Sequence, residues 1–505
     1  MEGEDTRIRL DINADKRDNV TEVVYKPTTM DQRDIKWNKK FHSLEPESRA
    51  AVVPKDSFYL YRTAFLGNLL AFSAGTGFSW TSPVLPRLNG PGSPLGAPLD
   101  PTEISIIAAI LCLGAAMGPF LFGYMADKVG RKITLMAIAA PMAAGAAILA
   151  FAWELWVFYF GRLLFGTGIG GVFTVLTMYT GEITSNHNRG KFSCLLGTFV
   201  ALGVLYPFSI GSMLSIRIFS LSCLLPLQAF LIFFSIYAPE SPTYLLRQGK
   251  KSLCQKTVME LRGISEEEAR KALDELEQIE SQNKEKGGIV VLFRTKNTRR
   301  AFMVAAGLLI LQQFSGISAV LGFMEQIFSG AGGAIPPQLA ATMVGVIQVF
   351  TVFVTSSVIE KLGRKFLLLS STVGAAVSII LLGFYFFLHR QKLVLLAYLW
   401  WLPIASLIFY IVCFNMGLGP LPWTVLSEIF PDNVKSSAAA VASATCFMVS
   451  FVVTMAFPMI NEMLGMAESF WLFGVCCVLG TVFIYFVVPE TKGRSVQEIQ
   501  EIFSK

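Results

Sequence analysis

The sequence predicts an all-α membrane protein with twelve transmembrane helices, arranged as two six-helix halves with a cytosolic helical linker between them. Hydrophobic residues make up 53% of the 505 residues and charged residues only 15%, against roughly 25% charged in soluble domains. Twelve charge-free runs, each of about 19 residues or more, are long enough to cross the ~30 Å hydrocarbon layer of a bilayer. Because unpaired backbone groups are unfavourable in lipid, such runs must be helices. Six of them precede a long polar segment and six follow it.

The charge-free runs give the order of the elements along the chain. They lie at 63–86, 104–126, 133–153, 163–181, 192–216, 218–239, 301–324, 326–359, 366–388, 393–427, 436–461 and 469–489. The polar stretches then divide the chain into an N-terminal tail (1–57), a first half (58–239), a linker (240–300), a second half (301–488) and a C-terminal tail (489–505). Most of the chain is therefore expected to lie in the lipid bilayer.

Basic residues in the loops predict the orientation of the chain. With the N-terminus in the cytoplasm, the short inner loops hold Lys128, Arg131, Lys132, Arg189, Lys191, Lys361, Arg364, Lys365 and Lys435, whereas the outer loops hold Arg87, Arg217, Arg390 and Lys392. This excess follows the positive-inside rule and predicts that both termini are cytoplasmic. We expect a multi-pass protein of the cell membrane, and an intracellular membrane stays the alternative. The formal charge of +6 does not indicate a nucleic-acid partner, because the basic residues are spread over these loops.

The linker is expected to contain a helix that opens at Ser265, which is an N-cap followed by three glutamates that suit the helix dipole. Leu273, Leu276 and Ile279 then form one apolar stripe on an otherwise charged helix. We expect this stripe to pack under the inner face of the bundle. A fully solvated linker helix is the alternative.

Three acid-bearing motifs occur in the same order in the inner loops of both halves. Asp127 to Lys132 matches Glu360 to Lys365, Glu182 with Arg189 matches Glu428 with Lys435, and Pro239-Glu240-Ser241 matches Pro489-Glu490-Thr491. Duplication of a six-helix unit is the simplest explanation. Two parallel halves related by an axis along the membrane normal are a known transporter architecture, with the binding site between them.

These charges predict a gate on the cytoplasmic side. Acids and bases there can pair with each other and with helix ends, so they stabilise closure of that face until the halves rock apart. The expected members are Asp127, Arg131, Arg162, Glu182, Arg189, Glu240, Glu360, Arg364, Glu428, Lys435 and Glu490. Arg162 begins the fourth span and is expected to pair with Glu182 or Glu428. The alternative is that these charges only set the orientation of the chain in the membrane. This would explain the basic residues but not the acids paired with them.

Eight motifs in a fixed order resemble the sugar porter family of the major facilitator superfamily, over residues 58–495. They are the Gly123–Lys132 loop, Gly161-Arg162, Tyr179 with Glu182 and Arg189-Gly190, Pro239–Pro242, Gln312–Gly316, Gly363–Lys365, Gly417–Trp423 with Glu428, and Pro489–Arg494. Within that family the chain is most similar to the insect facilitated trehalose transporter-like branch. The resemblance implies the major facilitator fold and transport of a sugar, a hexose or trehalose, by alternating access.

A sugar pocket needs amide side chains for the hydroxyls and an aromatic platform for the ring face. Gln312 and Gln313 interrupt an apolar run, where facing lipid would be unfavourable, and the resemblance places both against the sugar. Trp423 follows a Gly- and Pro-rich run that must interrupt its helix, which is tolerated only beside protein or a water-filled cavity. An interhelical role for the glutamines and an interfacial role for Trp423 are the alternatives. By resemblance, Thr76, Ser318, Gln348 and Asn415 complete the expected site.

Several positions depart from the family pattern. The usual amides of spans 5, 7 and 11 are replaced by Gly197, Ser318 and Cys446, and Phe447 replaces a tryptophan. At roughly 1 kcal/mol for each lost net hydrogen bond, such changes can remove or redirect glucose affinity. Gly197 also opens space for a disaccharide or a polyol. Which sugar is carried, and in which direction, therefore stays open, as does the oligomeric state.

The expected mode of transport is uniport. By resemblance, proton-coupled sugar porters carry a carboxylate in span 1 near the span-4 arginine, but that position is Gly75, and no acid occurs from 63 to 86. Glu325 and Glu154 lie too near the outer surface to replace it. A proton-coupled symporter and a sugar sensor that does not transport are the alternatives. An enzyme is not expected, because His42, His187 and His389 are far apart. No metal or other cofactor is expected either.

Overall fold

The structure is a computed structural model that describes residues 57–90, 93–185, 188–282, 292, 296–359, 362–392, 398–430, 432–492, 494, 498–499 and 502–503. In this part of the chain the regular secondary structure is helical throughout. The long N-terminal tail falls outside it, and the description below concerns the compact unit formed from residue 55 onward.

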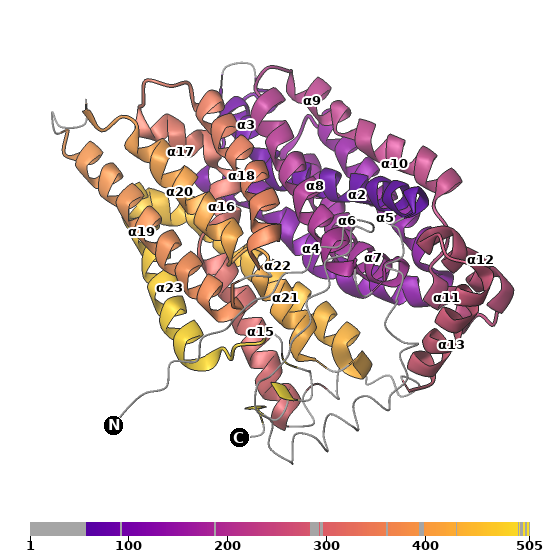
Figure 1. Cartoon of the computed structure of the whole chain (residues 1–505). Helices are drawn as coiled ribbons and strands as arrows, with labels where there is room; N and C mark the ends of the chain where they lie inside the picture. The colour runs from indigo at the N-terminus through magenta and orange to yellow at the C-terminus, as the bar shows by residue number, and fades with distance from the viewer. Residues whose placement is uncertain are drawn as a thin grey trace, which may run out of the picture. The chain divides into compact units, whose positions relative to one another are not determined.

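The first half is built from α2 (Phe58–Ser79) to α10, the linker from α11 to α13, and the second half from α15 to α23 (Figure 1). The first half contains α3 (Thr81–Leu88), α4 (Pro101–Val129), α5 (Arg131–Ala150), α6 (Leu155–Gly171), the π-helix η2 (Val172–Leu176), α7 (Thr177–Ile183), α8 (Arg189–Ile210), α9 (Ile216–Ser222) and α10 (Leu224–Tyr237). The linker contains α11 (Pro242–Arg247), α12 (Lys251–Arg262) and α13 (Glu266–Gln282). The second half contains α15 (Lys296–Phe314), α16 (Ile317–Gly322), α17 (Met324–Ala331), α18 (Pro337–Ile359), α19 (Arg364–Arg390), α20 (Leu402–Met416), α21 (Leu421–Ile429), α22 (Asp432–Met463) and α23 (Met466–Val487).

The described helices confirm the twelve-helix membrane fold. Eleven spans are long and apolar enough to cross a membrane. Helix α2 is the twelfth: it has 22 residues, carries a single charge at Arg62, and packs against α8 and α10. The two halves meet most extensively where α4 packs on α22 and α8 packs on α18.

Two of the spans are broken where the sequence contains glycine. Span 7 stops at Phe314 and restarts at Ile317, because Gly316 takes a φ of 88°, which favours glycine. Span 10 is interrupted between Met416 and Leu421, as the Gly- and Pro-rich run predicted. The charge-free runs at 63–86 and 326–359 were each expected to form one span. Each is instead divided, into α2 with α3 and α17 with α18.

Glycines bring α4 and α6 into backbone contact. A Cβ atom at Gly166 would lie 2.0 Å from the Leu111 carbonyl oxygen, and one at Gly170 would lie 2.1 Å from that of Ala115. On the opposing helix, Gly114 and Gly118 have equally little room. The glycine run that starts at Gly166 is therefore a helix-packing element, as the sequence predicts.

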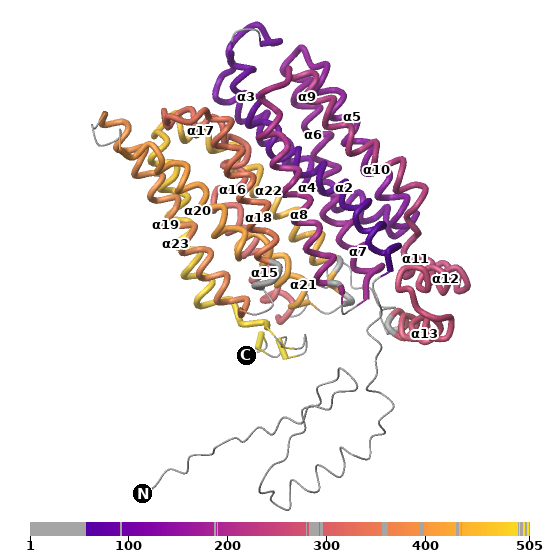
Figure 2. Tube along the Cα trace, turned by 45° about the horizontal axis from the view of Figure 1, so that its top comes forward, coloured from indigo at the N-terminus to yellow at the C-terminus, as the bar shows by residue number. Residues whose placement is uncertain are grey.

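The linker helices lie at one end of the bundle, which we call the linker end, and α3, α9 and α17 lie at the opposite end, which we call the far end (Figure 2). Ser265 caps α13 and is itself held by the Glu268 carboxylate, as expected. The expected packing of the apolar stripe under the bundle was wrong for Leu273, which is buried with Leu245 and Val258 in a small core of the linker itself. Three short helices can bury one narrow stripe among themselves.

Replacement of Gly166 by leucine is expected to destabilise the first half by about 3 kcal/mol or more, because the new side chain must push α4 and α6 apart. Thermal unfolding and size-exclusion behaviour of the purified protein measure the effect. Gly181→Leu is the matched control, since a Cβ there meets nothing within 4 Å. Equal melting temperatures for the two variants would contradict the packing argument.

Candidate functional site

Gln312 and Gln313 lie side by side near the end of α15, just before the break in span 7, and both are buried. The Gln312 amide nitrogen donates to the carbonyl oxygens of Leu418 at 2.9 Å and Gly419 at 2.7 Å. These carbonyls are free to accept because span 10 is interrupted there. The two helix breaks are thus joined by one glutamine, at the centre of the second half.

A thiol lies between the two glutamines. Cys446 of α22 donates to Gln312 Oε1 and receives a hydrogen bond from Gln313 Nε2, with S···O and S···N distances of 3.8 and 3.3 Å. Gln313 Oε1 accepts from Ser318 Oγ at 2.8 Å, and Ser450 Oγ donates to Ser318 Oγ at 2.7 Å. Ser318 and Cys446, two of the three residues at positions where the family usually has amides, therefore join the glutamines in a continuous polar network.

The polar network crosses from the second half to the first. Ser450 Oγ lies 3.2 Å from the Cys112 Sγ atom of α4, and both side chains are buried. A neutral contact of this kind is worth roughly 1 kcal/mol. It connects the halves without fixing them together.

Gln348 is the expected site residue whose polar group is left unpaired. Its side chain is 7% exposed, and Oε1 is buried without a hydrogen-bond partner among the described residues. Gly345 and Val352, one helical turn away on either side, face α8, so Gln348 lies on the same face. A buried amide oxygen without a donor is unfavourable by roughly 1–3 kcal/mol. Gln348 Oε1 is therefore an unpaired acceptor at the contact between α18 and α8, and its expected role in sugar binding stays a prediction.

Four aromatic rings meet across the two halves beside this region. Phe173 stacks on Trp423 with ring centroids 6.0 Å apart, and it lies 5.8 Å from Phe447. Phe78 lies against both Phe173 and Phe447, at 6.1 and 6.5 Å. Phe173 belongs to the π-helix η2, a distortion that is frequent at functional sites. Trp423 is half-buried, so part of its ring can serve as a platform for a sugar.

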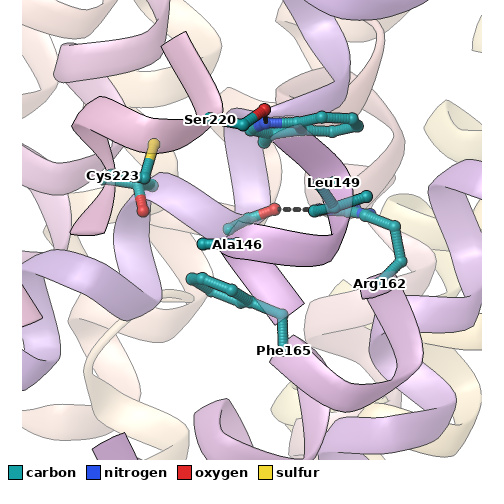
Figure 3. Close-up of a pocket in the computed structure, with 9 residues that line it drawn as sticks. Ala146, Leu149, Arg162, Phe165, Ser220 and Cys223 are labelled. Atoms are coloured by element: carbon teal, nitrogen blue, oxygen red, sulfur yellow. Dashed lines mark hydrogen bonds between the residues drawn. The ribbon is translucent and has the colours of Figure 1, made fainter. Parts of the chain in front are cut away.

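Asn415 and Thr76 do not join this network. The Asn415 amide donates to the Ile411 carbonyl of its own helix. Thr76 is buried, donates to the Ser73 carbonyl, and lines a small cavity inside the first half together with Arg162, Ser220 and Cys223 (Figure 3). With a volume of about 10 Å³, this cavity is large enough for about one water molecule and not for a sugar.

The expected pairing of Arg162 with Glu182 or Glu428 was wrong. Arg162 is 1% exposed and donates to the carbonyl oxygens of Gly77, Ile107 and Ala108. It lies in the second turn of α6, on the far-end side, whereas Glu182 lies twenty residues further along the same span. At 1.5 Å per residue they are about 30 Å apart. Arg162 therefore holds α2, α4 and α6 together and is separate from the charges at the linker end.

At the linker end, four charged residues of the first half form one cluster: Asp127, Arg131, Glu182 and Glu240. The Arg131 guanidinium, which is buried, contacts Glu182 at 2.9 Å and Asp127 at 3.6 Å. The Glu240 carboxylate accepts from the backbone nitrogens of Arg131 and Lys132 at 2.9 and 3.1 Å, and so caps α5. A Cβ at Gly130 would lie 2.4 Å from this carboxylate, which explains the glycine.

The second half repeats the principal contacts of this cluster. Arg364 contacts Glu428 at 3.1 Å, and Glu490 accepts from the backbone nitrogens of Arg364 and Lys365 at 2.9 and 3.1 Å. The Thr491 hydroxyl donates to Glu428, as that of Ser241 donates to Glu182. The motifs repeated in the loops of the two halves therefore make equivalent ion pairs and helix caps.

These ion pairs join residues of the same half. Arg131 with Glu182 and Arg364 with Glu428 stay within their six-helix units. Lys435 is half-buried in the first turn of α22, whereas Glu360 and the side chain of Arg189 lie outside the described residues. The expectation that these charges open and close a gate therefore stays a prediction.

Sequence reasoning missed the contacts that join the halves at the far end. Thr81 Oγ1 donates to the Gly322 carbonyl at 3.0 Å, and Ser212 Oγ donates to Glu325 at 2.8 Å. Gln338 and Thr342 of α18 donate to carbonyls at the end of α8 at 3.1 and 2.9 Å. Single neutral side chains near helix ends form no pattern that would predict such contacts from a sequence. The short polar stretch Thr81-Ser82, at the end of the first span, was the one local hint of them.

The chain belongs to the Sugar (and other) transporter family, whose profile matches residues 56–503. It is 31% identical to the facilitated trehalose transporter Tret1 of Bombyx mori over 439 residues, which cover 86% of this chain and 85% of that protein. It is 32% identical to Tret1 of Apis mellifera ligustica over 406 residues, which cover 79% of each chain.

Solved structures of a major facilitator protein share the fold. The proton:xylose symporter XylE bound to 6-bromo-6-deoxy-D-glucose has a TM-score of 0.73 and 24% identity, and the match covers 88% of this chain and 99% of that one. The partially occluded inward-open form of the xylose transporter XylE from E. coli has the same TM-score and 23% identity, over 87% and 100% of the two chains. The major facilitator fold expected from the motifs is confirmed.

Replacement of Glu240 or Glu490 by glutamine is expected to lower stability by about 1–2 kcal/mol each, because each carboxylate caps a helix that begins at an arginine. Thermal unfolding of the purified protein measures the loss. Burial opposes ionisation of Glu490, but the backbone amides of Lys492, Lys365, Arg364 and Thr491 outweigh it and hold its pKa below the ordinary value. The contribution of Glu490 is therefore present above about pH 4.5 and is lost as the pH falls through the lower folded-state pKa.

Glu275→Gln, on the exposed face of the linker helix α13, is the control for both variants. If it lowers the melting temperature as much as the two cap variants do, the capping role is wrong.

Proposed function

We propose that this chain is a facilitative sugar uniporter that works by alternating access, with trehalose or a hexose as its substrate. The observation that carries the proposal is Gln348 of α18, on the face that packs against α8 of the other half, whose buried acceptor has no partner among the described residues. Sugar hydroxyls are donors that match it. The trehalose transporters to which the chain is similar support trehalose as the first candidate.

The proposed site consists of Gln312, Gln313, Ser318 and Gln348, with the Trp423 ring as the platform. The glutamines already bond to Cys446, to Ser318 and to backbone carbonyls, so a sugar must exchange with these contacts. Gly197 lies opposite Val352, at 3.6 Å from a Cβ built on the glycine. The missing side chain supports a substrate larger than one ring. Asn415 and Thr76 are proposed only as members of the surrounding wall, because both are bonded to their own helices.

We further propose that the linker end is cytoplasmic, that the chain resides in the cell membrane, and that the two charge clusters act at the cytoplasmic gate. The excess of basic residues in the loops of the linker end supports this orientation. Each cluster holds one six-helix half as a unit, so closure at that end brings two rigid charged surfaces together.

Uptake of a panel of trehalose, glucose, fructose and polyols into proteoliposomes tests the proposal. Gln348→Ala is expected to raise KM for the transported sugar about fivefold or more, which corresponds to the loss of roughly 1 kcal/mol of ligand binding. Gln255→Ala, an amide on the linker helix α12, is the control and leaves KM unchanged. If every member of the panel enters equally in the wild type and the Gln348→Ala variant, the site is wrongly assigned.

Proton symport is the alternative, and the structure of the first half argues against it. A Cβ at Gly75, where the resemblance places the carboxylate of proton-coupled porters, would lie 2.2 Å from the Val200 carbonyl and 2.9 Å from the Gly203 Cα. There is no room for an acid at this position. The neighbouring Arg162 is occupied by carbonyl oxygens.

Initial uptake at a fixed sugar gradient is therefore expected to be unchanged by a protonophore. The measurement uses proteoliposomes with an imposed pH gradient, with and without the protonophore. An uptake rate that collapses about tenfold when the pH gradient is dissipated would establish symport in place of uniport.

A further inference from the structure

Glu325 is a buried carboxyl in the contact that closes the far end. It lies in α17, after the membrane span that ends at Gly322, and it is 7% exposed. Ser212, at the end of α8 in the first half, donates its hydroxyl to both carboxyl oxygens at 2.8 and 3.0 Å. The backbone nitrogen of Glu325 donates to Ser82 Oγ at 3.1 Å. One residue of the second half thus contacts two segments of the first.

The surroundings of Glu325 supply little positive charge. Arg87 of α3 is the charged group that acts on it, but its guanidinium donates to the carbonyls of Gly211, Ser212 and Leu214 at the end of α8. Helix α18 offers the neutral Gln338 and Thr342 on this side, each already bonded to α8. The first turn of α20, which also packs on α17, is apolar.

The carboxyl therefore meets two very different environments during a transport cycle. In the closed form it is buried, and burial raises its pKa above the ordinary value, which the Ser212 hydroxyl and the Arg87 charge only partly offset. When the halves separate at the far end, α17 leaves α3 and α8, and Glu325 enters water. The protonated form then has a preference for the closed state that the ionised form lacks.

We propose that Glu325 is a proton-binding site that couples protonation from the far-end solution to closure of the far end. The direction of the coupling between proton binding and closure follows from the pKa difference between the two states. Because the proton binds more tightly in the closed state, acid favours closure, and the preference is lost as the pH rises through the closed-state pKa. The window therefore begins near the ordinary glutamate value of 4.5 and extends above it.

This site differs from a coupling site for symport. Glu325 gains its proton from the far-end solution and returns it to the same solution when that end reopens. No proton crosses the membrane in the cycle, so the device regulates a uniporter and moves no extra ion. It predicts that acid on the far-end side slows sugar entry from that side by holding the gate shut.

The test measures the conformation directly and needs no sugar, so its outcome is independent of the proposed function. Nitroxide labels at Met213→Cys and Leu339→Cys report the distance between the halves, because both residues are exposed at the far end and belong to opposite halves. Protein without these two substitutions gives the background from the native cysteines, which are buried or half-buried. The closed-to-open ratio is measured by pulsed electron paramagnetic resonance in liposomes, between about pH 7.5 and pH 5.0.

In the wild type, acidification is expected to raise the closed-to-open ratio by about threefold or more. Glu325→Gln, which keeps the shape and an acceptor for Ser212, is expected to show the high ratio at every pH. Ser212→Ala removes a donor to the carboxylate, so the midpoint of the pH response moves upward. Glu468→Gln is the matched control, since Glu468 pairs with Arg390 of the same half at the far end.

The proposal is overturned if the wild-type ratio does not change with pH, or if acid opens the far end. It is equally overturned if Glu325→Gln keeps the wild-type response, or if Glu468→Gln abolishes it. Should Glu325→Gln fail to fold, the direction of the midpoint shift in Ser212→Ala decides: no shift or a downward shift refutes the site.

Discussion

In the part of the chain that the structure describes, the main ion pair of each charge cluster lies within one half, and the movement of the halves depends on that constraint. Arg131 with Glu182 and Arg364 with Glu428 are partly shielded ion pairs, supported by carboxylates that cap α5 and α19. Breaking such a group leaves charge without a partner and is unfavourable by several kcal/mol. Across the halves, by contrast, the described contacts are neutral hydrogen bonds, ring contacts and the bonds of Glu325. Each of these is worth roughly 1 kcal/mol, so the halves can separate while each stays folded.

The parts of the fold that follow from chemistry repeated along the chain could be predicted from the sequence. Because a bilayer requires long apolar helices, the twelve spans could be predicted from the apolar runs. The duplicated loops predicted the two charge clusters that the structure shows around Glu240 and Glu490. The interruption of span 10 before Trp423 was equally visible, because glycine and proline act on their own backbone. One prediction that failed concerns the end of the bundle at which a charged residue lies. Arg162 was assigned to the linker end, yet it lies near the far-end start of its span, where carbonyl oxygens of two neighbouring helices satisfy it.

The central site illustrates why residue type alone predicts a pocket incompletely. Whether a side chain faces a ligand or a neighbour depends on the rotation of its helix. Thr76 faces the interior of its own half, whereas Gln348 lies on the face of α18 that packs against α8 of the other half. Cys446 completes a network in which both glutamines are already paired. A pocket of paired amides favours substrates that offer many hydroxyls, because each exchange of a protein contact for a sugar contact contributes little alone. A disaccharide supplies more such exchanges than a hexose does.

The same packing that builds the first half also decides what can drive transport. Gly75 and Gly203 let α2 and α8 approach until their backbones touch, and this closeness removes the space in which an acid could stand beside Arg162. The arginine then needs other acceptors, and it finds them in the backbone of α2 and α4, where its charge rigidifies the half. The backbone carbonyls that accept from this arginine do not titrate, so these hydrogen bonds do not themselves respond to pH. A carboxyl elsewhere can still make the protein sensitive to pH, and the site that we propose at Glu325 would act on the far-end contact without driving transport.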